Sequence, residues 1–229
     1  MTRIAGMVDA ELRKLWSLWQ VPLVAVATWA MAGIVAATLR TTPEMMLTPV
    51  DMAALVPDYV QAGPIVLGVI ATTSEYTSRQ IVVSLAAVPR RADLVAAKLL
   101  ALTASTAAIS LVSMLITFHV AGATWSAGEA RLTTLTVGYL TAVGLMAGGL
   151  GLVLRHLIPT LGTALGLLVI APPLLTPLTG LARYLPGTAA TRWYGVQVAA
   201  PEPGAGWLIA AWALVVCALG AVALVRKDA

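Results

Sequence analysis

Six charged side chains are gathered in one stretch of the chain, residues 74–98, between two long apolar runs. They are Glu75, Arg79, Arg90, Arg91, Asp93 and Lys98. A mixture of carboxylates and basic groups suits ion pairs with another protein, and such pairs set partner choice and orientation. We therefore interpret this stretch as a surface that another protein binds.

The local sequence predicts a short helix within this stretch. Thr72 and Glu75 have the spacing of a capping box, and Glu75 and Arg79 form an i,i+4 pair. The apolar side of the helix would consist of Ile81, Val82 and Leu85. Pro89 ends it and Asp93 caps the next helix. The alternative is an ordinary connection whose arginines only follow the positive-inside rule.

The sequence contains no motif of a familiar hydrolase or nucleotide-binding site. Its two histidines, His119 and His156, are far apart, and there is no HExxH, GxSxG or GxxxxGK[ST] motif. We therefore expect no catalytic site, no metal site and no cofactor bound by this chain.

The composition predicts an all-α integral membrane protein. Of 229 residues, 59% are hydrophobic and 10% charged, and the mean hydropathy is +0.90. A bilayer core needs about 20 apolar residues per helix, so residues 1–229 hold six spans in a single transmembrane domain. The net charge of +4 must be divided between the two sides of the membrane, and we expect no nucleic-acid partner.

The apolar runs place the spans. We expect them at about 21–39, 59–73, 94–120, 132–154, 157–178 and 207–225. The second is short if it starts at Tyr59 and long enough if Met52–Val56 belong to it. Residues 1–19 have the pattern of an interfacial helix, although they could instead extend the first span. Residues 74–93 form the charged loop, and 179–206 form a polar loop on the other side. No ionisable residue is expected deep within a span, which argues against a proton-coupled antiporter or an ion pump.

Prolines and glycines predict irregular helices. Pro64 kinks the second span, and Pro172, Pro173 and Pro177 remove backbone donors from the fifth. We therefore expect the outer end of the fifth span to be broken or re-entrant. The spacing from Gly144 to Gly148 favours close helix packing in the fourth span.

The positions of the basic residues predict the orientation. With the N-terminus inside, ten lysines and arginines are cytoplasmic and four are outside. The outer four are Arg40, Arg131, Arg183 and Arg192. Both termini and residues 74–93 are therefore expected in the cytoplasm.

Several segments resemble the bacterial type-2 ABC export permeases. The cytoplasmic loop of that family is matched by Ser74–Ile81 (SEYTSRQI), Leu85–Arg91 (LAAVPRR) and Ala96–Lys98 (AAK), and its outer Leu-Pro-x-x-Ala element by Leu185–Ala189 (LPGTA). The resemblance covers nearly the full chain. It departs at Arg79-Gln80, where many members carry Gly-Thr.

This resemblance implies a permease subunit in the bacterial cytoplasmic (inner) membrane. Two such domains, identical or homologous, would dock on two cytoplasmic ATP-binding cassette subunits, which hold ATP and Mg²⁺. A coupling helix would begin at Glu75, and the coupling residues would be Glu75, Tyr76, Arg79, Gln80, Arg90 and Arg91. The export path for a drug, antibiotic, peptide or lipid-like molecule would follow the second and fifth spans near Pro64, Pro172 and Pro173.

Two other functions are compatible with the sequence. The chain could be a non-transporting membrane subunit for immunity or signalling that binds a cytoplasmic partner through the same loop. It could also be a membrane enzyme acting on lipids, with candidate residues Glu129, His119, Asp51 and Asp58 on separate outer segments.

Overall fold

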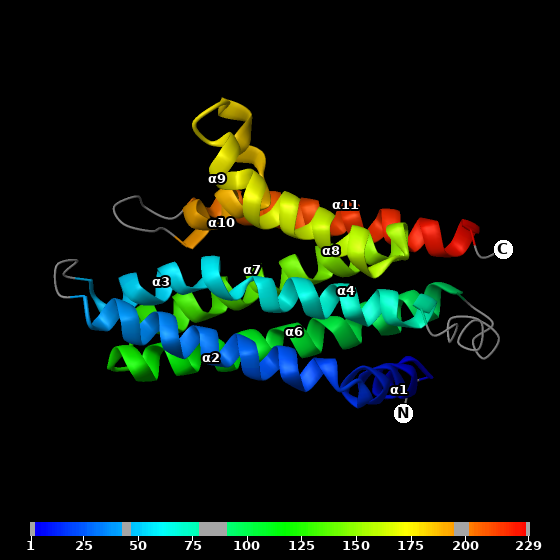
Figure 1. The fold of residues 1–229 in the computed structure, drawn as a ribbon, viewed down its shortest axis with the longest axis horizontal. Helices are drawn as coiled ribbons and strands as arrows, with labels where there is room; N and C mark the ends of the chain where they lie inside the picture. The colour runs from blue at the N-terminus through cyan, green and yellow to red at the C-terminus, as the bar shows by residue number, and fades with distance from the viewer. Residues whose placement is uncertain (1–2, 43–46, 78–90, 195–201, 228–229) are drawn as a thin grey trace.

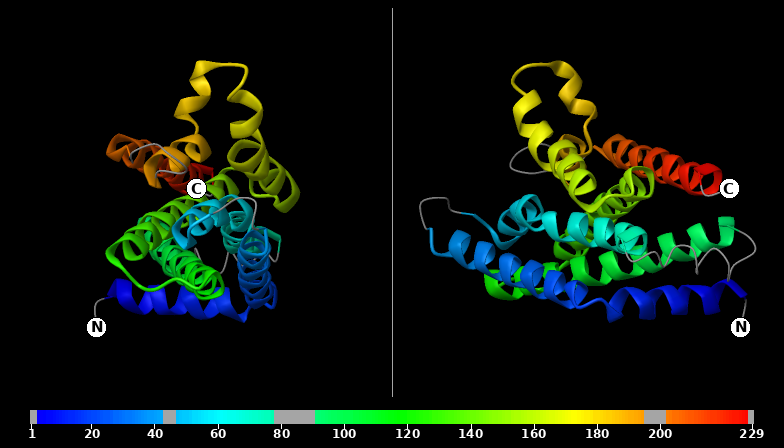
Figure 2. Two further views of the ribbon diagram at one scale, coloured as in Figure 1. Left: turned by 90° about the vertical axis from the view of Figure 1, so that its left-hand side faces the viewer. Right: turned by 45° about the vertical axis from the view of Figure 1, so that its right-hand side comes forward.

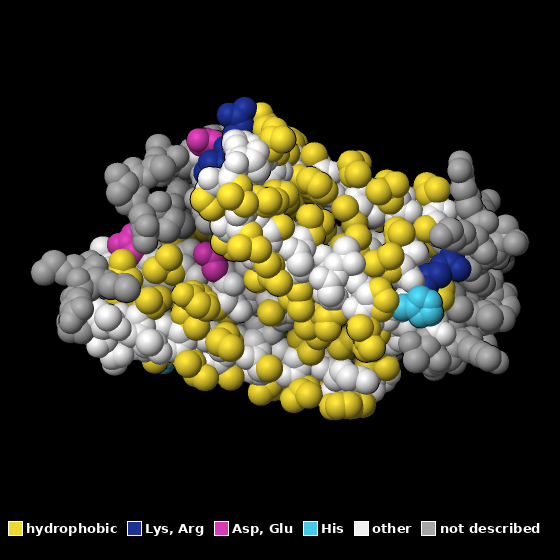
Figure 3. All heavy atoms as spheres, turned by 45° about the horizontal axis from the view of Figure 1, so that its top comes forward, with side chains coloured by type: hydrophobic (Ala, Val, Ile, Leu, Met, Phe, Trp, Pro, Cys, Tyr) yellow, Lys and Arg dark blue, Asp and Glu magenta, His cyan; other side chains and the backbone are white. Residues whose placement is uncertain are grey.

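The computed structural model describes residues 3–42, 47–77, 91–194 and 202–227, and these are helical apart from short turns, with no strand among them. Six helical segments are long and apolar enough to cross a membrane. They are Gln20–Arg40, Pro49–Tyr76, Ala92–Ala121, Ala127–Leu154, Leu157–Leu175 and Gly204–Val225. The prediction of an all-α chain with six spanning helices is confirmed. The surface in Figure 3 is mostly hydrophobic and carries few charged side chains.

The helices follow one another along the chain with short connections. Their bounds are α1 (Arg3–Ser17), α2 (Gln20–Arg40), α3 (Pro49–Val60), α4 (Ala62–Thr77), α6 (Arg91–Ala121), α7 (Ala127–Leu154), α8 (Leu157–Leu165), the π-helical η2 (Gly166–Ile170), α9 (Ala171–Leu175), the 3-10 helix η3 (Gly180–Tyr184), α10 (Pro186–Tyr194) and α11 (Pro203–Lys227). In Figure 1 the start of α1 and the C-terminal end of α11 lie at the same end of the bundle.

Helix α7 is the centre of the bundle and packs against α4, α6 and α11. Glycines make this close approach possible. A Cβ atom at Gly144 would lie 2.6 Å from the Thr106 side chain, and one at Gly149 would lie 2.8 Å from the Val216 carbonyl oxygen. A Cβ atom at Gly68 of α4 would lie 2.2 Å from the Gly144 carbonyl oxygen. The predicted close packing at Gly144 and Gly148 is confirmed.

The second span starts at Pro49, ten residues before the predicted Tyr59. Thr48 and Asp51 form a capping box at its start. The span breaks at Gln61, between α3 and α4, because Pro64 has no N–H to donate to the Val60 carbonyl. The predicted kink is therefore present.

The longer second span corrects one expectation about charge. Asp58, which we expected in an outer loop, lies within α3 and within the spanning segment. Glu75 and Lys98 lie near the ends of their spanning segments. The argument against proton-coupled transport rested on the absence of ionisable residues deep within the spans, and the position of Asp58 removes that support.

The fifth span is interrupted. Helix α8 passes into the π-helical η2, where Ala171 donates its N–H to the Gly166 carbonyl, five residues back. The wider turn comes directly before Pro172 and Pro173, which have no N–H to donate to a preceding carbonyl. Both views in Figure 2 show α9 and the turn after it standing away from the other helices.

Two local predictions were wrong. Thr72 does not cap a new helix, because α4 continues to Thr77 and the Thr72 hydroxyl donates to the Gly68 carbonyl within it. The fourth span begins at Ala127, where Ser126 and Glu129 form a capping box.

Candidate functional site

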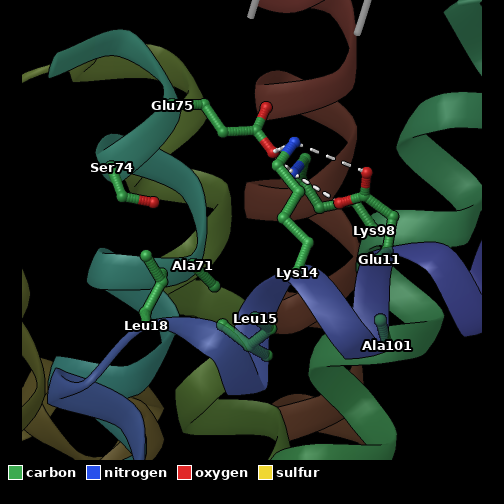
Figure 4. A pocket seen from close by; sticks show the side chains of 9 residues that line it. All are labelled: Glu11, Lys14, Leu15, Leu18, Ala71, Ser74, Glu75, Lys98 and Ala101. Carbon is green, nitrogen blue, oxygen red and sulfur yellow. Dashed lines mark hydrogen bonds and ion pairs between the residues drawn. The ribbon is translucent and has the colours of Figure 1, made fainter. Parts of the chain in front are cut away.

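Four charged side chains from three helices meet at the end of the bundle where α1 lies. We call Glu11 and Lys14 of α1, Glu75 of α4 and Lys98 of α6 the ionic cluster (Figure 4). The ammonium of Lys98 lies 2.8 Å from Glu11 Oε2 and 2.5 Å from Glu75 Oε1. Lys14 also pairs with Glu75, and it lies 3.8 Å from Glu11 Oε1. Each carboxylate therefore contacts both ammonium groups.

The innermost members of the cluster are almost fully buried. The side chains of Glu75 and Lys98 are 3% and 4% exposed. Removing a charge from water carries a large penalty unless it is paired, and the cluster has two positive and two negative groups. The cavity that it lines measures only 20 Å³, so the cluster is a packed contact between helices and not a substrate pocket.

Helix α1 is amphipathic, and its apolar residues hold it against α6. Leu15 is buried in a cluster with Val21, Leu67 and Leu102. Trp16 donates its indole N–H to the Ser105 hydroxyl of α6 at 3.1 Å. Trp19 is 70% exposed, which leaves an aromatic ring on the outer face of this end of the bundle.

The predicted coupling residues are only partly within the described chain. The Glu75 carboxylate points inward to the ionic cluster, and the Tyr76 ring lies 5.2 Å from the Arg155 guanidinium carbon. Arg79, Gln80 and Arg90 lie outside the described residues, as does most of the predicted short helix that Pro89 ends. Of Arg91 only its place at the start of α6 is described.

The site prediction omitted three members of the ionic cluster. Lys98 was matched to the family pattern but was not assigned a role. Glu11 and Lys14 lie within the predicted interfacial helix, residues 1–19, and neither was assigned a role. Their i,i+3 spacing places them on one face of α1, and this spacing was the one available signal. Burial against α4 and α6 is a tertiary property that the spacing does not reveal.

A second site is an open groove of 520 Å³ beside α3 and α9. It is lined by Asp58, Tyr59, Gln61, Leu168, Val169, Pro172, Pro173, Thr176, Gly187, Thr188 and Thr191. Pro172 and Pro173, predicted to follow a transport path, therefore lie together at this groove. Pro64 is absent from its lining and is buried where α4 meets α7.

Hydrogen bonds fix the position of Gln61, a polar residue of the groove lining. Tyr139 of α7 donates its hydroxyl to Gln61 Oε1 at 2.8 Å, and Gln61 Nε2 donates to the Asp58 carbonyl at 3.1 Å. Tyr194 of α10 packs edge-on against Tyr139. Burial, and after it the neighbouring Asp58 and Tyr139, raise the pKa of the Tyr194 hydroxyl well above its usual value, so this hydroxyl stays protonated.

The residues considered for lipid chemistry are separate from one another. Asp51 and Glu129 each belong to a helix-capping box, with Thr48 and Ser126 respectively. Within the described residues, no group of three or more His, Cys, Asp or Glu side chains could hold a metal ion.

No protein-family model matches the chain, and no curated protein is significantly similar to it.

Proposed function

We propose that this chain is the transmembrane permease subunit of an ATP-driven exporter of the type-2 ABC class. The observation that carries the proposal is the ion pair between Glu75 and Lys98. In the resemblance described above, these residues stand at the two ends of the cytoplasmic loop, a Glu before the coupling helix and a Lys at the start of the next span. Their pairing brings the two ends of that loop together.

The ionic cluster supports a route for mechanical coupling. A partner that pushes on residues 78–90 moves the ends of α4 and α6, because the chain joins them directly. Glu75 and Lys98 are also bound to Lys14 and Glu11 of α1, so α1 moves with them. Buried ion pairs of this kind keep packed helices in one register. Glu75 would then transmit force from inside the bundle without itself touching the partner.

The movement would continue through α7. Helix α4 contacts α7 at Gly68, where no side chain lies between the two backbones, and α7 contacts α11 in the same manner at Gly149. Tightly packed helices shift as bodies, because their interfaces do not deform continuously. A displacement of α4 would therefore reach the groove beside α3 and α9.

The orientation follows from the basic residues. The positive-inside rule predicts that both termini are cytoplasmic and that the ionic cluster lies at the cytoplasmic end of the spans, near ATP-binding cassette subunits that hold ATP and Mg²⁺. Helix α1 would lie along the inner headgroups, with Trp16 and Trp19 at the interface. The break in the fifth span, η3 and α10 would form the re-entrant outer end. A second copy or a homologous permease would complete the path.

Purification from native membranes in mild detergent tests this proposal. A C-terminally tagged chain should bring with it an ATP-binding subunit whose ATP hydrolysis is inhibited by vanadate. Recovery of no such subunit, or transport in liposomes that needs a proton gradient and no ATP, would contradict the proposal. A recovered partner without ATP-dependent transport would favour the non-transporting subunit.

Paired variants sharpen the test of coupling. Glu75→Gln should leave the partner bound but lower the stimulation of ATP hydrolysis by transported substrate. Asp9→Asn is the matched control, since Asp9 pairs with Arg13 on the exposed side of α1, outside the ionic cluster. Equal stimulation in both variants would contradict the role assigned to the ionic cluster.

A further inference from the structure

Asp58 is an acidic residue within a spanning segment that the proposed function does not use. It lies in α3, ten residues into the segment Pro49–Tyr76. Its side chain is exposed and lines the groove. None of the ion pairs formed among the described residues includes Asp58. Ionisable residues within membrane spans are costly and mark substrate or ion pathways by default.

The groove has the size of a small-molecule site. Its volume of 520 Å³ falls within the range of about 300–1,000 Å³ that is usual for such sites. The side contributed by η2 and α9 is mainly apolar and includes Leu168, Val169, Pro172 and Pro173. An organic molecule with an apolar body can therefore pack against this side.

The uncharged polar residues of the lining are Tyr59, Gln61, Thr176, Thr188 and Thr191. The hydroxyls of Thr176 and Thr191 donate to the backbone carbonyls of Pro172 and Thr188. Gln61 is fixed by the Tyr139 hydroxyl. The hydroxyl oxygen of Thr188 is buried and has no hydrogen-bond partner among the described residues. Gly187, beside it, allows α10 to approach η2 and α9 closely, since a Cβ atom there would lie 2.9 Å from the Pro172 ring. An apolar wall, five uncharged polar residues and one carboxylate thus line one space.

We propose that this groove binds an amphipathic organic cation, with Asp58 as its charge partner. The assignment rests on the proposed function and names its substrate class. The carboxylate supplies the charge complementarity, and the walls of η2 and α9 supply apolar contact. A hard metal cation does not fit, because Ca²⁺ takes six to eight oxygen ligands and Mg²⁺ six, and the groove offers one carboxylate.

Binding of tetraphenylphosphonium to the full chain in phosphatidylcholine nanodiscs tests the proposal without ATP or partner subunits. Tetraphenylborate, an anion of the same shape, separates charge recognition from apolar adsorption. We expect saturable binding of the cation and no saturable binding of the anion. Asp58→Asn should weaken cation binding about tenfold or more, since loss of one partner of a desolvated charge pair is costly.

Two further variants control the result. Asp58→Glu keeps the charge and should keep most of the affinity. Glu202→Gln removes a carboxylate that pairs with Arg192 outside the groove and should leave binding unchanged. Equal binding of both ions, or unchanged cation binding by Asp58→Asn, would overturn the proposal. The proposal would also be overturned if a second copy of the chain covered the groove. In that case, cysteines introduced in place of Pro173 in both copies would form a disulfide.

The outcomes for the groove and for the permease function are separate. Recovery of an ATP-binding subunit together with Asp58-independent binding would refute only the cation site. If the cation bound in an Asp58-dependent manner but purification from native membranes recovered no ATP-binding subunit, only the ATP-driven mechanism would be refuted.

Discussion

The ammonium of Lys98 lies 2.5 Å from the carboxylate of Glu75, and both side chains are nearly inaccessible to solvent. The two residues are 23 positions apart and belong to α6 and α4. Their pairing holds the end of α4 against the start of α6. Glu11 and Lys14 connect both helices to α1. This arrangement has direct consequences for stability.

Lys98→Met should destabilise the protein strongly. The substitution leaves Glu75 and Glu11 with only Lys14 to compensate them, and breaking a buried ion pair costs about 3–5 kcal/mol. We expect a loss of that order in the free energy of unfolding, measured by SDS titration in lipid–detergent micelles. The double variant Glu75→Gln/Lys98→Met should lose less than the sum of the two single variants, because Glu11 and Lys14 remain as a neutral pair.

The exposed ion pair on α1 is the control for this experiment. Asp9 and Arg13 are 59% and 81% exposed, and exposed pairs contribute about 0–1 kcal/mol. If Asp9→Asn lowered the free energy of unfolding as much as Lys98→Met did, the burial of the ionic cluster would not contribute to stability.

Gly68→Ala should disturb the contact between α4 and α7. Its new Cβ atom would lie 2.2 Å from the Gly144 carbonyl oxygen and 2.9 Å from the Gly148 nitrogen, which are backbone atoms that cannot rotate away. Overpacking of this kind costs about 1–3 kcal/mol, and the same SDS titration measures it. Gly162→Ala adds the same methyl group where no atom lies within 4 Å and should be neutral.

Tyr139→Phe should loosen the polar wall of the groove. It removes the hydroxyl that donates to Gln61 Oε1, and an unpaired buried acceptor costs about 1–3 kcal/mol. We expect a lower unfolding temperature. Tyr59→Phe is the control, because Tyr59 is 58% exposed. Equal effects of the two substitutions would indicate that the Gln61 contact contributes nothing.

Reporter fusions test the orientation. A fluorescent protein fused after Ala229 should fluoresce, and alkaline phosphatase at the same position should be inactive, because the C-terminus is expected in the cytoplasm. Phosphatase fused after Glu202, beyond the fifth span, should be active. Active phosphatase at the C-terminus would reverse the assignment and remove the ionic cluster from the side where ATP is present.

Local chemistry made much of the fold predictable from the sequence. Runs of about 20 apolar residues are sufficient to specify spanning helices, since a bilayer offers no other partner for the backbone. The interruptions of the second and fifth spans lie beside Pro64 and Pro172, which lack the N–H that a regular α-helix requires. Gly144 and Gly148 predicted close packing for a similar reason, the absence of a side chain.

The candidate sites depended on tertiary structure. The spacing of Thr72 and Glu75 predicted a helix start, but packing against α7 carries α4 through to Thr77. Nothing in the spacing places Glu11 beside Lys98, 87 residues away, or Asp58 beside the prolines of the fifth span. Charge and hydropathy patterns determine which residues can enter a membrane and where helices end, whereas the meeting of distant side chains depends on how the helices pack.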